Sequence, residues 1–104
     1  MKYTDGTYKY VGGGKFERFD REALGYWVSS TNLKIEMEGT EKLAMLALVE
    51  REGATYVGIW TADSGDRYVD KAHYVRDREV AEASGRYWNQ EAIWDIANSK
   101  AIYL

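Results

Sequence analysis

Hydrophobic and polar residues alternate in several stretches of the chain, which is the pattern of half-buried strands. In "LKIEME" (33–38), leucine, isoleucine and methionine face one way, and lysine and the glutamates face the other. "TYVGIWTA" (55–62) and "RYVDKAHYV" (67–75) are rich in β-branched and aromatic residues, and "DSGD" between them is typical of a tight turn. These patterns predict a strand at 33–38 and a hairpin over 55–75.

Turn residues near both ends of the chain predict further hairpins. "KYTDGTYKYV" (2–11) indicates a hairpin with Asp5-Gly6 as its two-residue turn, and "GGG" (12–14) indicates a hinge or loop after it. Near the other end, "EAIWDI" and "AIYL" flank a turn at Asn98-Ser99 and predict a closing hairpin. Before residue 30, Asp20 favours one helical turn around 20–24, which leads into a strand at Tyr26–Ser29.

The segment 40–52, "TEKLAMLALVERE", has two interpretations. Its Ala, Leu, Met, Glu and Lys favour a helix, with Thr40 as its N-cap and Gly53 just past its end. Its continuous apolar middle also fits a buried strand. We expect the helix.

A second helix is predicted where Asp77 precedes "REVAEASGRYW" (78–88). Glu82 and Arg86 would pair on its outer face. Five positions at helical spacing predict a buried stripe that ends in two aromatic rings: Val80, Ala81, Ser84, Tyr87 and Trp88.

Together these elements predict an α+β fold: one domain over residues 1–104, with an antiparallel sheet and one or two helices packed on one face. The chain contains no apolar run long enough to span a bilayer, and its first residues lack the apolar segment of a signal peptide. We therefore expect a cytoplasmic protein that does not bind membranes.

Charge and cysteine content exclude several function classes. The chain has 14 Lys and Arg against 17 Asp and Glu, a net charge of −3. Binding to the nucleic-acid backbone requires a basic footprint, so this class is disfavoured. Without cysteine the chain has no disulfide framework, thiolate nucleophile or thiolate metal site.

The remaining polar candidates give no clear catalytic or metal site. His73 is the single histidine, so it cannot form a histidine metal site, and no nucleophile motif accompanies it. Asp63, Asp66 and Asp70 lie close together in the sequence, but turn chemistry accounts for "DSGD" and the spacing does not match a calcium loop. No catalytic, metal or cofactor-binding residue is assigned, and no cofactor is expected. A small enzyme or ligand-binding module that uses His73 with Asp70 or Asp66 stays a second hypothesis.

Aromatic residues are the one compositional excess, with nine Tyr and four Trp against two Phe. Alternation places Tyr56 and Trp60 on the same face of one strand, and Tyr68 and Tyr74 on the same face of the neighbouring strand. We therefore expect these four side chains to form one contiguous aromatic surface. We expect at least two of them to be substantially exposed and to contact a protein partner. One alternative is that a helix covers this face as a second core layer. Another is that the face joins copies of the chain, as a homodimer or a larger structural assembly.

The C-terminal half resembles the small orphan accessory proteins of bacteriophages, notably phages of actinobacterial hosts. The resemblance runs from "TYVGIWTADSGDRYVDKAHYV" through "DREVAEASGRYWNQEAIWDI". It implies a protein without enzymatic activity that binds and inhibits a host protein, such as a defence system in the manner of anti-CRISPR proteins. No residue roles are implied. The leading hypothesis is therefore a small soluble interaction module that occludes a surface of a host protein.

Overall fold

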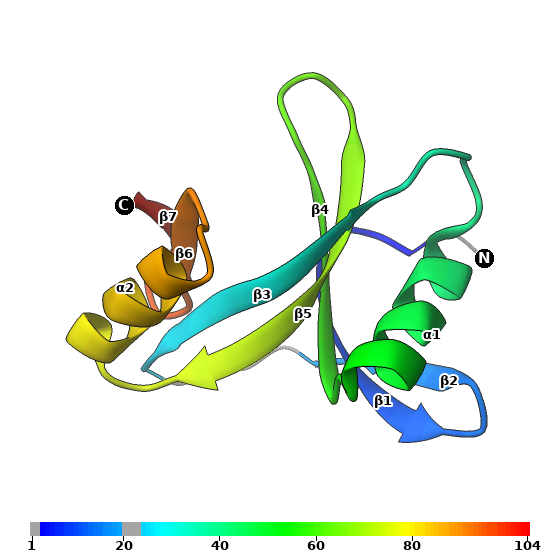
Figure 1. Ribbon diagram of the computed structural model, residues 1–104, viewed down its shortest axis with the longest axis horizontal. Helices are drawn as coiled ribbons and strands as arrows, with labels where there is room; N and C mark the ends of the chain where they lie inside the picture. The colour runs from blue at the N-terminus through cyan, green and yellow to red at the C-terminus, as the bar shows by residue number, and fades with distance from the viewer. Residues whose placement is uncertain (1–2, 20–23) are drawn as a thin grey trace. The chain divides into compact units, whose positions relative to one another are not determined.

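The structure is a computed structural model that describes residues 3–19 and 24–104 (Figure 1). The helical turn expected around 20–24, with Asp20 as its cap, lies outside the described residues except for Leu24. Within the described residues the elements are β1 (Gly6–Gly12), β2 (Lys15–Arg18), β3 (Tyr26–Lys34), α1 (Glu41–Glu52), β4 (Tyr56–Thr61), β5 (Arg67–Val75), α2 (Arg78–Tyr87), β6 (Ala92–Asp95) and β7 (Lys100–Tyr103).

The described strands form one antiparallel sheet in the order β2-β1-β4-β5-β3-β6-β7, which confirms the predicted α+β class. The contacts within the chain group into two compact units. Unit 1 contains the described residues of 1–20 and 32–71, and unit 2 contains those of 21–31 and 72–104. The long strands β3 and β5 supply residues to both. Neither described helix is long and apolar enough to cross a bilayer.

Helix α1 in unit 1 is the helix predicted over 40–52. Gly53 ends it with a φ of 66°, and its N–H donates to the carbonyl of Val49 at 3.1 Å. Thr40 precedes the helix, but its hydroxyl donates to the carbonyl of Met37 at 2.6 Å instead of capping it. The core beneath α1 has seven buried members: Tyr8, Met45, Leu48, Ala54, Val57, Ile59 and Val69.

The N-terminal hairpin differs from its prediction. The turn lies at the glycines and joins β1 to β2, with Tyr10 opposite Phe16, whereas Gly6 already belongs to β1. Gly13 and Gly14 have φ values of 60° and 74°, which glycine adopts at little cost, so they form the turn in place of Asp5-Gly6.

The predicted strand at 33–38 is wrong beyond Lys34. Ile35 extends the pairing by one residue, since its N–H donates to the carbonyl of Arg67 at 2.8 Å. Met37 is 69% exposed. Alternation alone cannot show where a strand ends, and here the turn at Gly39, with a φ of 88°, starts the approach to α1.

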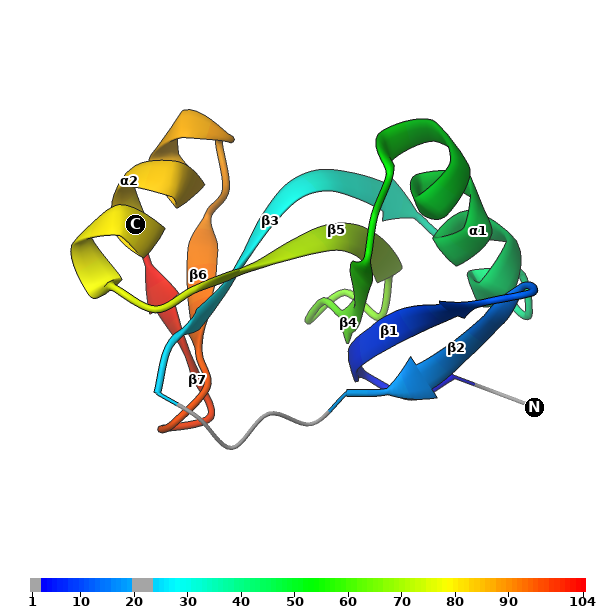
Figure 2. The same cartoon turned by 90° about the horizontal axis from the view of Figure 1, so that it is seen from below.

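Helix α2 in unit 2 begins as predicted, because Asp77 Oδ1 accepts the N–H of Val80 at 3.0 Å. Glu82 accepts hydrogen bonds from Arg78 at 2.8 Å and from Arg86 at 3.4 Å. Figures 1 and 2 both show α2 alongside β6.

The face of α2 that is buried differs from the predicted one, because the helix is rotated about its axis relative to the expectation. Ala81 and Gly85 are buried and Trp88 is half-buried, whereas Val80 and Tyr87 are 54% and 82% exposed. The cause is close packing. A Cβ at Gly85 would lie 2.6 Å from Leu104 Cδ1, so the helix turns its smallest residues toward the sheet.

The closing hairpin of unit 2 is confirmed as β6 and β7, with Ser99 in the turn at a φ of 49°. Its pairing places Ile93 opposite Ile102 and Trp94 opposite Ala101. The unit 2 core consists of the following buried and partly buried residues: Tyr26, Val28, Val75, Ala81, Trp88, Ile93, Ile102 and Leu104.

Candidate functional site

The four residues predicted to bind a partner are divided between the two units, because Tyr74 belongs to unit 2 and the other three belong to unit 1. Trp60 and Tyr68 stack at 4.6 Å between ring centroids, with an interplanar angle of 17°. Tyr56 packs on Phe19 at 5.0 Å. Of the four, which all lie in the described part of the chain, Trp60 is exposed at 40% and the other three are half-buried.

Tyr74 belongs to unit 2, where it contacts other residues. Its ring meets Trp27 edge-on at 5.8 Å, and its hydroxyl donates to the carbonyl of Leu24. Within the predicted aromatic surface, Trp60 and Tyr68 thus form a stacked pair. Tyr74 instead contacts Trp27 and belongs to a second group of aromatic rings in unit 2.

That set lies on the face of the unit 2 sheet opposite α2. Four residues of this sheet belong to the core or pack against it: Val28, Val75, Ile93 and Ile102. Because side chains alternate along a strand, the aromatic residue beside each one points to the opposite face. We call this surface the aromatic face and define it by Trp27, Tyr74, Trp94 and Tyr103.

The strand pairing brings the aromatic face together. Trp27 lies directly opposite Trp94 across β3 and β6, and Tyr103 lies opposite Ala92 across β6 and β7. Trp94 and Tyr103 remain 44% and 78% exposed, whereas Trp27 and Tyr74 are half-buried. Apart from these rings, alternation places only small or hydroxylated residues on the described part of this face: Ser29, Thr31, Ala72, Ala92 and Ala101. Within the described parts of β3, β5, β6 and β7 in unit 2, this face therefore carries no charged side chain.

Sequence reasoning missed the aromatic face, although the chain contains a signal for it. An aromatic residue stands directly beside a β-branched aliphatic residue in each contributing strand: Trp27-Val28, Tyr74-Val75, Ile93-Trp94 and Ile102-Tyr103. Such neighbours point to opposite faces, so this pattern separates an aliphatic core face from an aromatic outer face.

His73 lies on the other side of β5, toward α2. Its Nε2 is 2.7 Å from the hydroxyl oxygen of Ser30, and its ring stacks on Trp88 at 4.6 Å. All three side chains are half-buried. The structure thus joins the single histidine to a hydroxyl and an indole.

The aspartates considered as partners of His73 have structural contacts of their own in unit 1. Asp70 is 6% exposed, and a Cβ at Gly58 would lie 2.7 Å from its Oδ1, so the glycine makes room for the carboxylate. Asp66 accepts a hydrogen bond from Ser64 at 3.1 Å and lies 3.7 Å from the ammonium of Lys34. Among the described residues, no three His, Asp or Glu side chains are grouped as a metal site would require.

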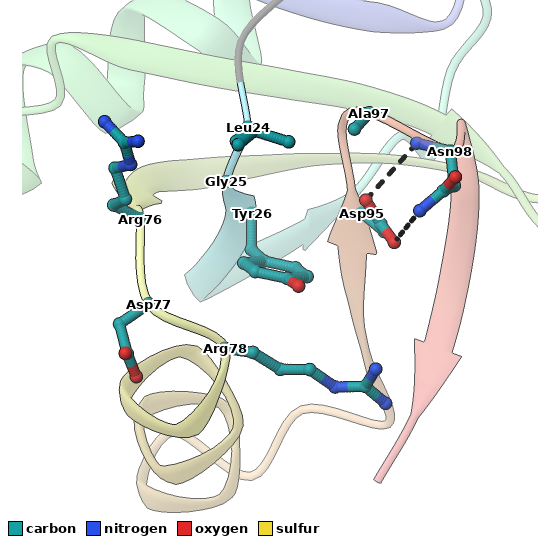
Figure 3. Close-up of a pocket in the computed structure, with 9 residues that line it drawn as sticks. All are labelled: Leu24, Gly25, Tyr26, Arg76, Asp77, Arg78, Asp95, Ala97 and Asn98. Atoms are coloured by element: carbon teal, nitrogen blue, oxygen red, sulfur yellow. Dashed lines mark hydrogen bonds between the residues drawn. The ribbon is translucent and has the colours of Figure 1, made fainter.

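Unit 2 also contains a hollow of about 410 Å³ near the start of α2 (Figure 3). Its lining carries two cations and two carboxylates: Arg76, Arg78, Asp77 and Asp95. Both carboxylates have local roles, because Asp77 caps α2 and Asp95 accepts the Asn98 side-chain amide at 2.8 Å and its backbone N–H at 3.3 Å. The Asn98 side-chain hydrogen bond is the main cause that lowers the pKa of Asp95. The two cations and two carboxylates of the lining balance each other, so the hollow favours neither an anion nor a cation.

Comparison of the chain with protein-family models, with curated proteins and with solved structures finds no match. The function is therefore inferred from the geometry of the chain itself.

Proposed function

We propose that this protein is a protein-binding module whose contact surface is the aromatic face of unit 2. The observation that carries the proposal is the exposure of Trp94 and Tyr103 on a sheet face that bears no charge. Tyr and Trp combine a large apolar area with a polar group, and they are the residues most enriched among the strong contacts of protein interfaces.

The chemistry of this face supports a protein partner over a nucleic acid. Nucleic-acid binding requires cations that neutralise phosphates, and the aromatic face offers none while the chain carries a net charge of −3. Uncharged aromatic cores surrounded by polar residues are typical of interfaces between proteins. Here the hydroxyls of Ser29 and Thr31 supply polar groups beside the rings.

The more specific form of the proposal follows from the resemblance to phage accessory proteins. The partner would be a protein of the bacterial host, such as a component of a defence system. Binding would inhibit it by covering a surface that it needs. This mechanism requires no catalytic residue and no cofactor from the chain.

The experiment compares three exposed aromatic positions. Trp94→Ala and Tyr103→Ala alter the aromatic face, and Tyr87→Ala, at 82% exposed on α2, is the matched control. The tagged variants are used for capture from an actinobacterial lysate with quantitative mass spectrometry, and each melting temperature is measured. We expect a captured protein that the control retains and that Trp94→Ala loses by about 30-fold in affinity, equivalent to about 2 kcal/mol. Equal capture by all three variants would reject the aromatic face as the binding surface.

A second candidate function rests on the 2.7 Å contact between Ser30 and His73. A hydroxyl that can donate its proton to an imidazole is the arrangement of a serine nucleophile and its general base. Labelling with a fluorophosphonate probe tests this directly. Modification of Ser30 that disappears in His73→Gln would support a hydrolase, whereas an unlabelled wild-type chain would leave the pair as a structural contact.

A further inference from the structure

Among the residues that the structure describes, strand β7 has a neighbouring strand on one side only. Within the described residues it stands at the end of the sheet, with β6 as its neighbour. The N–H of Leu104 donates to the carbonyl of Glu91 at 2.9 Å. This bond shows which residue pairs of the β6–β7 hairpin are hydrogen-bonded and which are not. Ile102 therefore directs its backbone groups toward β6, and Ala101 and Tyr103 direct theirs away. Two N–H groups and two carbonyls face outward along this edge.

The edge at the opposite end of the sheet is different. Three of the four residues of β2 are charged and exposed: Lys15, Glu17 and Arg18. Charged side chains are a common protection of edge strands against pairing with another chain. Strand β7 has one charged residue, Lys100, followed by Ala101, Ile102 and Tyr103. The β7 edge is the less protected of the two.

We propose that β7 pairs antiparallel with β7 of a second copy of the chain. In this pairing Ile102 lies opposite Ile102 of the second copy, and Ala101 lies opposite Tyr103 of the second copy. The outward N–H and carbonyl groups then form four backbone hydrogen bonds, two for each Ala101–Tyr103 pair. A register centred on Ala101 would instead place Tyr103 opposite Ser99, whose φ of 49° belongs to the turn and not to a strand.

Side-chain sizes favour the same register. Across the β6–β7 hairpin each large ring lies opposite an alanine, Trp94 opposite Ala101 and Tyr103 opposite Ala92. The proposed register repeats this rule, since the ring of Tyr103 lies opposite Ala101 of the second copy. On the other face the two Ile102 side chains meet, and each is already packed against its own core. The aromatic face continues from one copy to the next.

The absence of cysteine from the chain allows a direct test of the register. Residues opposite each other in a non-hydrogen-bonded antiparallel pair have Cα atoms about 4.5 Å apart, a distance that a disulfide spans. We expect Ile102→Cys to form a covalent dimer under mild oxidation. In the control, Lys100→Cys, the two substituted positions lie four residues apart along the strands, about 13 Å, and should not crosslink. No crosslink at position 102, or equal crosslinking of both variants, would overturn the proposal.

Sedimentation of the unmodified chain tests the association itself. Two four-residue strands form a small interface, so we expect a monomer–dimer equilibrium between about 10 µM and 1 mM that approaches twice the 11.9 kDa of one chain. Ala101→Pro removes an N–H that faces away from β6, and proline is tolerated at such edge positions. We expect this variant to stay monomeric with an unchanged melting temperature. The proposal is contradicted if the wild type stays monomeric throughout this range, or if the proline variant associates like the wild type. If the proline variant does not fold, the comparison of Ile102→Cys with Lys100→Cys tests the proposal in its place.

Discussion

Unit 1 and unit 2 place aromatic side chains on the face of the sheet opposite the helix, but they use them differently. In unit 1 Trp60 and Tyr68 stack on each other, Tyr56 packs on Phe19, and a buried carboxylate, Asp70, lies against Gly58 on the same face. In unit 2 Tyr103 lies opposite Ala92 and is 78% exposed, and Trp94, which lies between Ala101 and Trp27, is about as exposed as Trp60 of unit 1. Composition alone therefore does not decide whether a ring is core or contact surface. The side chains that pack against each ring decide how much of it is buried.

The largest expected effects come from the two cores. Met45→Ala in unit 1 and Ile93→Ala in unit 2 each empty a site that is at least 98% buried, which should cost about 3 kcal/mol. Because β3 and β5 supply residues to both units, we expect each variant to lower the midpoint of one common unfolding transition. Denaturant unfolding followed by tryptophan fluorescence and by far-UV circular dichroism measures this. Two separate transitions would show that the units are independent domains, against the expectation of a single domain over 1–104.

A smaller difference is expected between the two aromatic surfaces. Tyr68→Ala removes one ring of the stacked pair and should cost about 1–2 kcal/mol of stability. Trp94→Ala removes an exposed ring and should cost less than about 1 kcal/mol, although its ring is the larger. Thermal melts of the two variants side by side give the comparison. A larger loss for Trp94→Ala would mean that the aromatic face is part of the unit 2 core.

The smallest effect concerns the acid stability of the turn between β6 and β7. Hydrogen bonds from Asn98 hold the pKa of Asp95 below its ordinary value of 3.8. The ionised carboxylate therefore stabilises the fold above this value, and the contribution is lost as the pH falls through the lowered pKa. The stability difference between wild type and Asp95→Asn should be constant near neutral pH and shrink below about pH 4. Asp63→Asn, in the unit 1 turn between β4 and β5, is the control, and a difference that grows on acidification would contradict the prediction.

Most elements of the fold could be predicted from local signals. The helix before Gly53, the cap at Asp77 and the strand Arg67–Val75 all follow from residues adjacent in the sequence. The local signals failed where two candidate turns competed, since Gly13 and Gly14 formed the first turn in place of Asp5-Gly6.

The candidate site was harder to predict, because alternation shows which residues share a face but not which face a helix covers. The exposure of Tyr87 could not be foreseen, since the orientation of α2 depends on the close approach of Gly85 to Leu104. The aromatic face likewise required the pairing of β3 with β6, which joins residues far apart in the sequence. Of the four residues proposed from the sequence, Tyr74 is a member of this face.

The charged edge at β2 has a consequence for how far assembly of this chain can proceed. Open-ended growth into a filament requires two different surfaces that fit each other, so that every added molecule exposes a fresh site. Joining through two identical β7 edges uses both of them and leaves no such site, because the remaining ends carry Lys15, Glu17 and Arg18. The proposed association would therefore be closed by symmetry at two molecules. A protein whose sheet has only one unprotected edge strand can thus reach a high concentration without forming filaments.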